Sequence, residues 1–221
     1  RTLAAGDVWA GCRSVIATPG TVAYLVSLTA LFGVFISFLA SSEVVLDQVF
    51  DLGDWFPAYF GGLALVMGSA MWLNGRIVER VGLDRLIRIV FTANVGVSGT
   101  LTALALATGG TPPFWIFVVV LAAMLFGHQM LIPNINAAAM RPLSHVAGTG
   151  AAILGMVPGV LGSILGGLID DRFDGTVTPL SMAFAISTVV AFATWSATGR
   201  GSRTSDPTAP PAAPAAPRQG P

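Results

Sequence analysis

The sequence predicts an all-α membrane protein with six transmembrane helices. Its composition is 54% hydrophobic and only 10% charged, with a mean hydropathy of +0.77, whereas soluble domains carry about 25% charged residues. Six uncharged stretches each reach the roughly 20 residues that a helix needs to cross a bilayer core. The period-two alternation of a membrane β-barrel is not visible, so the spans are expected to be helices in a lipid bilayer.

Composition also excludes several other classes of protein. The formal net charge is zero and lysine is absent, which argues against nucleic acid as a partner. Cys12 is the single cysteine, so a disulfide framework is excluded. We expect no metal site, and we look for the mechanism among the helices rather than in a soluble cleft.

The six predicted spans follow one another with short connections, which makes neighbouring spans antiparallel. They cover approximately residues 21–42, 55–73, 89–108, 114–140, 146–169 and 179–198. The predicted organisation is therefore a cytoplasmic linker over residues 1–20 and a six-helix transmembrane domain over residues 21–198. A Pro/Ala-rich cytoplasmic tail over residues 199–221 completes the chain.

The two flanking segments carry their own signals. Six prolines among the last fifteen residues, without apolar periodicity, predict that residues 199–221 are disordered; a role in partner binding is a less favoured reading. The sequence starts with Arg1 and lacks the pattern of a secretory signal peptide. We therefore expect it to be a fragment or a processed piece of a longer protein.

Charge predicts the orientation of the bundle. One side carries ten of the eleven arginines: Arg1, Arg13, Arg76, Arg80, Arg85, Arg88, Arg141, Arg200, Arg203 and Arg218. The other side carries Arg172 and seven of the eleven acids: Glu43, Asp47, Asp51, Asp54, Asp170, Asp171 and Asp174. Because loops rich in arginine stay in the cytoplasm, both termini are expected there, in a multi-pass protein of the cell (cytoplasmic or inner) membrane.

The fourth span holds the richest set of polar side chains. His128 and Gln129 lie near mid-membrane, and Asn134 and Asn136 follow Pro133. Polar groups inside a bilayer are costly and often functional, and Pro133 frees a backbone carbonyl one turn earlier. The first hypothesis is that these four polar residues line a substrate pathway, with Pro133 as a hinge. The alternative is that they only form hydrogen bonds between helices.

Two acidic residues mark the outer end of the first span. Glu43 and Asp47 are four residues apart, so they share a helix face. Two like charges this close favour a proton on one of them, which suits proton exchange at an outward mouth. The alternative is a solvated acidic loop, since Asp51 and Asp54 follow.

Glycine and proline shape the fifth span. Gly155, Gly159 and Gly162 lie at three- and four-residue spacing around Pro158. Small residues at this spacing let helix backbones approach closely. We predict helix packing and a hinge at Pro158, and no dinucleotide site.

A rival class rests on the third span. Gly96-Val97-Ser98-Gly99, at a depth similar to that of His128, resembles the Gly-x-Ser-Gly nucleophile and histidine base of six-helix intramembrane serine proteases. The motif is short, so this class remains a distant alternative to a protein that is not an enzyme.

The loop after the second span is similar to the cytoplasmic signature of the major facilitator superfamily, Gly-x-x-x-Asp-Arg-x-Gly-Arg-Arg. Gly75, Glu79, Arg80, Gly82 and Arg85 match it, with Glu79 in place of Asp. The rest is degenerate and reads Leu83-Asp84-Arg85. The resemblance implies that these residues belong to a cytoplasmic gate.

Two further stretches resemble the bicyclomycin-resistance drug–proton antiporters of that superfamily. They are Ile132-Pro133-Asn134 with Met140-Arg141-Pro142, and residues 145–152 with the sequence HVAGTGAA; the Asn74-Gly75-Arg76 triplet is also similar. The first span departs from that family, because Ser42-Glu43 and then Asp47 stand where those antiporters carry Ser-Pro and then Gln. The substrate range and coupling could therefore differ.

The resemblance implies that the six spans are helices seven to twelve of such an antiporter. The missing partner is then an N-terminal six-helix half, and the bundle is a three-plus-three inverted repeat over residues 20–108 and 112–199. The implied function is proton-coupled efflux of small amphipathic drugs by alternating access, with H⁺ as coupling ion and no other cofactor. A metabolite carrier for an amino acid or sugar and a self-standing oligomeric channel remain open.

Overall fold

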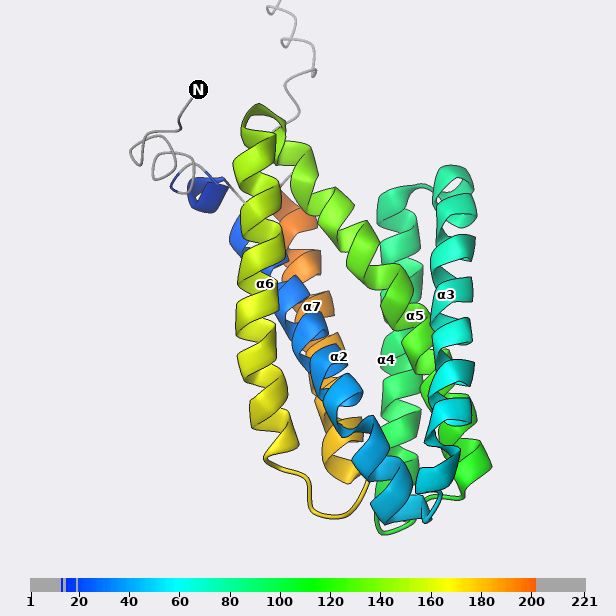
Figure 1. Ribbon diagram of the computed structural model, residues 1–221. Helices are drawn as coiled ribbons and strands as arrows, with labels where there is room; N and C mark the ends of the chain where they lie inside the picture. The colour runs from blue at the N-terminus through cyan, green and yellow to red at the C-terminus, as the bar shows by residue number, and fades with distance from the viewer. Residues whose placement is uncertain (1–12, 14, 19, 202–221) are drawn as a thin grey trace, which may run out of the picture.

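The computed structural model describes residues 13, 15–18 and 20–201. Six long helices follow one another (Figure 1), each long and apolar enough to cross a membrane. They are α2 (Thr21–Phe50), α3 (Phe56–Val81), α4 (Leu83–Ala107), α5 (Phe114–Met140), α6 (Ala147–Asp170) and α7 (Thr178–Gly201), with 3₁₀ turns η1 (Gly53–Trp55) and η2 (Arg141–Val146). The predicted all-α membrane fold with six spans is confirmed. Most of the predicted linker and tail lie outside the described residues.

Three helices are longer than predicted. The helix α2 continues to Phe50 instead of ending near residue 42, and α3 continues to Val81 instead of residue 73. The helix α4 begins at Leu83 instead of residue 89, so the predicted loop between the second and third spans is almost entirely helical. The added turns contain charged as well as apolar residues. The predicted spans are uncharged stretches, so they leave these turns out although the turns form regular helix. Glu43 and Asp47 consequently lie on α2 itself and not in a loop.

Glycine makes the tightest connection in the bundle. Gly82 alone separates α3 from α4, with a φ of 84°. A side chain at a positive φ is strained, so glycine suits this position. Its N–H donates to the carbonyl of Val78, and its own carbonyl accepts from the N–H of Leu86. The chain reverses direction here with its backbone groups still paired.

The connections alternate between the two ends of the bundle. One end, called the arginine-rich end, holds Gly82 and η2 (Figure 1); the opposite end, called the acidic end, holds residues 51–55, 108–113 and 171–177. Arg172 lies at the acidic end, whereas Arg80 and Arg141 lie at the arginine-rich end. The charge separation seen in the sequence is thus a separation in space.

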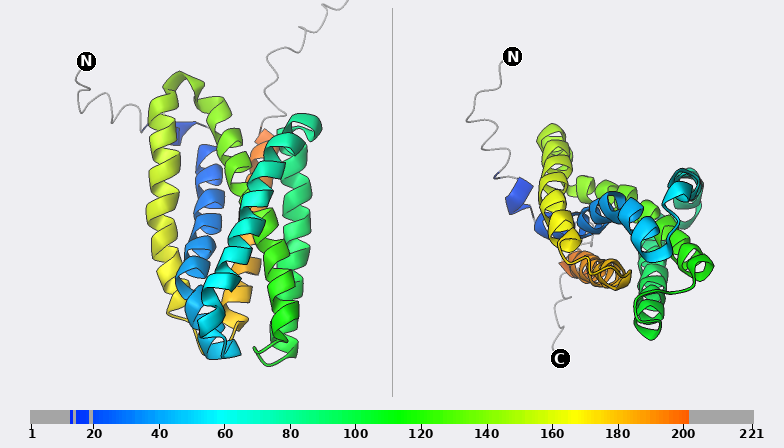
Figure 2. Two further views of the ribbon diagram at one scale, coloured as in Figure 1. Left: turned by 45° about the vertical axis from the view of Figure 1, so that its right-hand side comes forward. Right: turned by 60° about the horizontal axis from the view of Figure 1, so that its bottom comes forward.

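The helices form two triplets in which corresponding pairs of helices are in contact. In the first triplet α2 packs against both α6 and α7, and in the second α5 packs against both α3 and α4. The triplets meet through α2 against α5 and α4 against α7, and Figure 2 shows them side by side. Exchanging α2 with α5, α3 with α6 and α4 with α7 reproduces the same set of contacts, as a three-plus-three repeat requires.

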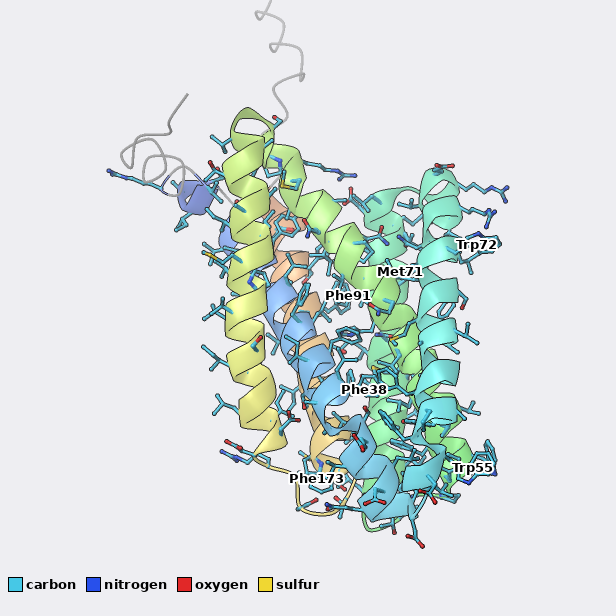
Figure 3. The ribbon with its side chains drawn as sticks, in the orientation of Figure 1. Phe38, Trp55, Met71, Trp72, Phe91 and Phe173 are labelled. Atoms are coloured by element: carbon cyan, nitrogen blue, oxygen red, sulfur yellow. The ribbon has the colours of Figure 1, made fainter. Side chains whose placement is uncertain are left out.

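The core consists of two apolar clusters stacked along the bundle. The cluster toward the arginine-rich end includes Leu31, Phe91 and Trp195, and the cluster toward the acidic end includes Phe38 and Phe184. Figure 3 shows Phe91 and Phe38 at these two levels inside the bundle. On α5, His128 and Gln129 lie between Leu125 of the cluster toward the acidic end and Met130 of the cluster toward the arginine-rich end, at the level where one cluster gives way to the other.

Candidate functional site

The polar residues of α5 reach three different helices. His128 contacts α2, Gln129 and Asn134 contact α3, and the adjoining turn contacts Asn94 of α4. Successive residues of a helix are rotated by about 100° from one another, so they face different neighbouring helices. This one segment of α5 therefore links α2, α3 and α4.

His128 is completely buried at the centre of this region. Its Nε2 donates to the carbonyl oxygen of Leu31 at 3.1 Å, which leaves Nδ1 as an acceptor that has no hydrogen-bond partner. The imidazole stacks on Phe35, with ring centroids 5.8 Å apart, and meets the edge of Phe184 at 6.0 Å. Hydrogen bonding and ring packing together fix the orientation of this side chain.

Asn134 forms a reciprocal amide pair with Asn74. The Asn134 amide nitrogen donates to Asn74 Oδ1 at 2.6 Å, and the Asn74 amide donates back to Asn134 Oδ1 at 3.3 Å. The Asn134 nitrogen also donates to the carbonyl oxygen of Met130 at 2.8 Å. Both side chains are buried, so the pair acts as an interhelical clasp between α3 and α5.

Gln129 and Asn136 are more accessible than their two polar neighbours, because both are half-buried. The Gln129 amide donates a weak hydrogen bond to the Met67 sulfur at 3.4 Å. A half-buried amide with so weak a partner can exchange it for a ligand. Gln129 and Asn136 are therefore the accessible members of the four predicted pathway residues, while His128 and Asn134 serve interhelical contacts in this conformation.

Asn94 and Ser98 lie on α4 beside this region, and both are buried. Oriented by the surrounding donors and acceptors, the Asn94 amide bridges the Met124 carbonyl and the His128 backbone N–H at 3.3 Å each. Ser98 Oγ donates to the Val95 carbonyl in its own helix at 3.2 Å. Ser98 Oγ thus bonds to Val95 and the His128 ring bonds to Leu31. The nucleophile–base contact of a serine protease is therefore not formed between Ser98 and His128.

The glycines of α6 divide into two groups. A Cβ atom added to Gly162 would lie 2.9 Å from Phe32 Cβ, and one added to Gly166 would lie 3.0 Å from the Gly33 carbonyl oxygen. At Gly155 and Gly159 an added Cβ would meet open space. Gly162 therefore lies in the close contact of α6 with α2, whereas Gly155 and Gly159 do not. Pro158 lies inside a continuous α6, as Pro133 does inside α5.

The residues of the gate motif lie at the arginine-rich end. Gly75, Glu79, Arg80, Gly82 and Arg85 are all exposed. The ion pair found at this end instead joins Asp84 to Arg141, with 2.8 Å between Oδ2 and Nη1. Asp84 stands where the sequence departs from the superfamily signature. It lies in the first turn of α4, where the helix dipole favours a carboxylate, and it connects that helix to the end of α5.

A second exposed contact at this end lies on α3. The Arg76 guanidinium stacks on the Trp72 ring, 3.4 Å from its centroid. Cation–π contacts of this kind hold a long side chain against the helix surface. Arg76 is thereby directed along α3.

At the acidic end, the predicted acids Glu43 and Asp47 are exposed on α2. A different acid lies between helices: Asp170, the last residue of α6, accepts a hydrogen bond from Ser37 Oγ of α2 at 2.5 Å. Ser37 is fully buried. In the charge pattern Asp170 was one acid among seven, although its position directly after an apolar span was a signal. Within the described part of the chain, no group of three potential metal ligands gathers.

Asn74 and Asn94 were also missed as site residues. Asn94 lies inside the predicted span 89–108, so the rule that selected Asn134 applied to it equally. Asn74 directly follows the predicted span 55–73, in a predicted loop, whereas α3 continues through it to Val81. The ion pair of Asp84 with Arg141 had no such signal, because its members are far apart in the sequence.

Comparison with known proteins identifies one similar curated protein. The chain is 24% identical over 168 residues to a bicyclomycin resistance protein homolog of Haemophilus influenzae, an alignment that covers 76% of this chain and 42% of that protein. The chain thus spans less than half the length of this relative. No protein-family model matches the chain, and no solved structure matches it. The chain is therefore a multi-pass, six-span membrane protein similar over three quarters of its length to a bicyclomycin resistance homologue.

Proposed function

We propose that this protein exports small amphipathic drugs across the cell membrane in exchange for protons. The observation that carries the proposal is the similarity to a protein named for drug resistance, which extends over most of the six spans. The motif from Gly75 to Arg85, at the junction of α3 and α4, resembles the major facilitator signature and supports the same class of transporter.

The two triplets, with their corresponding helix contacts, suit transport by alternating access. In such carriers two repeat-built halves rock about a central site, and this chain would supply helices seven to twelve, with an N-terminal half as its partner. Both termini would be cytoplasmic. Gln129 with His128, Asn134 and Asn136 would line the path, and the residues around Gly82 would form the inner gate.

A metabolite carrier of the same superfamily is the second candidate. The polar groups of α5 favour it, since amino acids and sugars need more hydrogen bonds than an apolar drug does. An intramembrane protease is a distant third candidate, because Ser98 Oγ is engaged with its own helix. Replacing Ser98 by alanine would abolish all activity of a protease, whereas a transporter would tolerate it.

Resistance profiling of the native gene product tests the proposal. Expression in a drug-hypersusceptible bacterium should raise the concentrations of several amphipathic drugs needed to stop growth, and dissipation of the proton gradient should remove the effect. Gln129→Ala and Asn134→Ala should change the profile, while Gln48→Ala, an exposed amide on α2, serves as the control. Unchanged profiles at normal expression would contradict the pathway assignment. Uptake of an amino acid or sugar without drug resistance would support the metabolite carrier.

A further inference from the structure

A large apolar cavity lies between α3 and α5 at the acidic end. Its volume is about 760 Å³, which is within the range of drug-binding pockets. Seven residues between Leu52 and Val66 form one wall, and four residues between Phe114 and Ala122 form the other. Figure 3 shows Trp55 at this end of the bundle, on the α3 side. The cavity occupies a seam within one triplet of helices.

The walls of the cavity are unusually aromatic. Trp55, Tyr59, Phe114 and Trp115 contribute four rings, and the two tryptophans are 66% and 76% exposed. None of the lining side chains is charged, and their polar atoms are the Tyr59 hydroxyl and the two indole N–H groups. Such walls favour a neutral ligand with a flat aromatic part.

The cavity is directed toward Gln129. On α5 the lining positions Val118 and Ala122 are four residues apart, and Gln129 follows Ala122 by seven residues, two turns further along nearly the same face. On α3 the lining residue Val66 immediately precedes Met67, whose sulfur accepts from Gln129. The apolar cavity thus leads toward an amide whose present partner is weak.

We propose that this cavity binds the aromatic part of a neutral amphipathic substrate, with the polar group of the substrate directed to Gln129. The inference rests on the proposed function and specifies its substrate class. A lipid acyl chain would match the apolar walls, but it would gain nothing from four rings or from the amide of Gln129, which lies two helical turns beyond the lining residue Ala122. The combination of an aromatic wall and a nearby amide therefore selects an aromatic molecule with one polar group.

Two adjacent glycines of α3 provide a matched pair of variants. Gly62 lines the cavity and Gly61 does not, and a Cβ atom at either position would meet open space. We therefore expect the helix to accept phenylalanine at both sites, but only Gly62→Phe fills the cavity, and the unfolding transition of both variants checks that each still folds. The probe is 1-aminoanthracene, a neutral aromatic amine, and binding to the native gene product in lipid nanodiscs is followed by energy transfer from tryptophan.

We expect saturable binding that weakens about tenfold or more in Gly62→Phe and changes by less than about twofold in Gly61→Phe. Anthracene, which lacks the amine, should bind about fivefold more weakly than 1-aminoanthracene, and Gln129→Leu should remove this preference. Equal effects of the two glycine variants, or no saturable binding, would overturn the inference.

Quenching of tryptophan by brominated phosphatidylcholine tests whether a lipid occupies the cavity instead. Trp72 is also exposed, so the quenching that belongs to the cavity is the part lost when Trp55 and Trp115 are both replaced by phenylalanine. If brominated phosphatidylcholine causes this part and 1-aminoanthracene does not relieve it, a lipid occupies the cavity and the inference is overturned.

Failure of the proposed function gives a different pattern. Binding that depends on Gly62 in a protein that confers no drug resistance would support the cavity assignment and refute drug export. Resistance together with no binding of the probe would refute the cavity assignment alone.

Discussion

The seam between α2 and α6 and the seam between α5 and α3 are equivalent positions of the two triplets, yet they are built differently. Glycines let α6 approach the backbone of α2, as at Gly162 and Gly166. The contact of α3 with α5 is less extensive. It depends on the clasp between Asn74 and Asn134, and it leaves a cavity of about 760 Å³ at the acidic end.

This difference separates a fixed contact from an adjustable one. In lipid, helices associate through close van der Waals packing and interhelical hydrogen bonds rather than through the hydrophobic effect. The contact between α2 and α6, called the glycine seam, uses close van der Waals packing along much of its length, so little space remains for a ligand or for sliding. The contact between α3 and α5, called the amide seam, uses interhelical hydrogen bonds at one level and stays open elsewhere. We expect α2 and α6 to move as one body, and we expect ligands to enter beside α3.

The largest expected effect is on the glycine seam. Leucine at Gly166 would force its side chain against the backbone of α2, because even a Cβ atom there lies 3.0 Å from the Gly33 carbonyl oxygen. Overpacking of this kind costs about 3 kcal/mol. Gly155→Leu, where the added atom meets open space, is the control. Denaturant titration in detergent micelles measures both free energies of unfolding, and similar losses for the two variants would contradict the fixed contact.

The amide clasp should contribute less. Alanine at Asn74 or at Asn134 leaves the other amide buried with one partner fewer, at a cost of about 1–2 kcal/mol. The double variant should lose less than the sum, with a coupling of about 1 kcal/mol. Asn136→Ala provides a half-buried amide in the same helix as a control. Strict additivity in the double-mutant cycle would show that the two amides do not stabilise each other.

The glycine seam ends in one polar contact at the acidic end, between Ser37 and Asp170. Asp170→Ala removes the acceptor of a 2.5 Å hydrogen bond from a buried serine and should cost about 1 kcal/mol. Asp171→Ala changes the adjacent, exposed carboxylate and should leave the free energy of unfolding unchanged. If both variants lose the same stability, the loss reflects the general charge of this end of the bundle and not the contact with Ser37.

The sequence was sufficient to predict the number of spans and the separation of charge, because both depend on composition along the chain. It also selected the polar residues of α5. It did not predict the helix that each of them contacts, since periodicity gives the face of a residue and not the neighbour opposite that face. His128 meets Leu31 and Asn134 meets Asn74 only through the packing of the triplets.

Features that need two separate segments were beyond the sequence. The cavity depends on how far α3 stands from α5 near their ends at Trp55 and Phe114, and no single stretch encodes that distance. The end of α2 was placed too early for a different reason. Glu43 and Asp47 interrupt the uncharged run, but they do not interrupt the helix. Glutamate is a good helix former, and both carboxylates are exposed, so neither has to be buried for the helix to continue.

The smallest expected effect concerns the ion pair of Asp84 with Arg141, which joins α4 to the end of α5. Both side chains are more than half exposed, at 62% and 54%, and exposed pairs contribute less than about 1 kcal/mol. A cycle of Asp84→Ala and Arg141→Ala should therefore give a small coupling energy that falls as salt screens the charges. The pair connects helices of the triplet that also contains α3, so its weakness fits an adjustable triplet. A coupling that is large and insensitive to salt would mean instead that the arginine-rich end of this triplet is locked as firmly as the glycine seam.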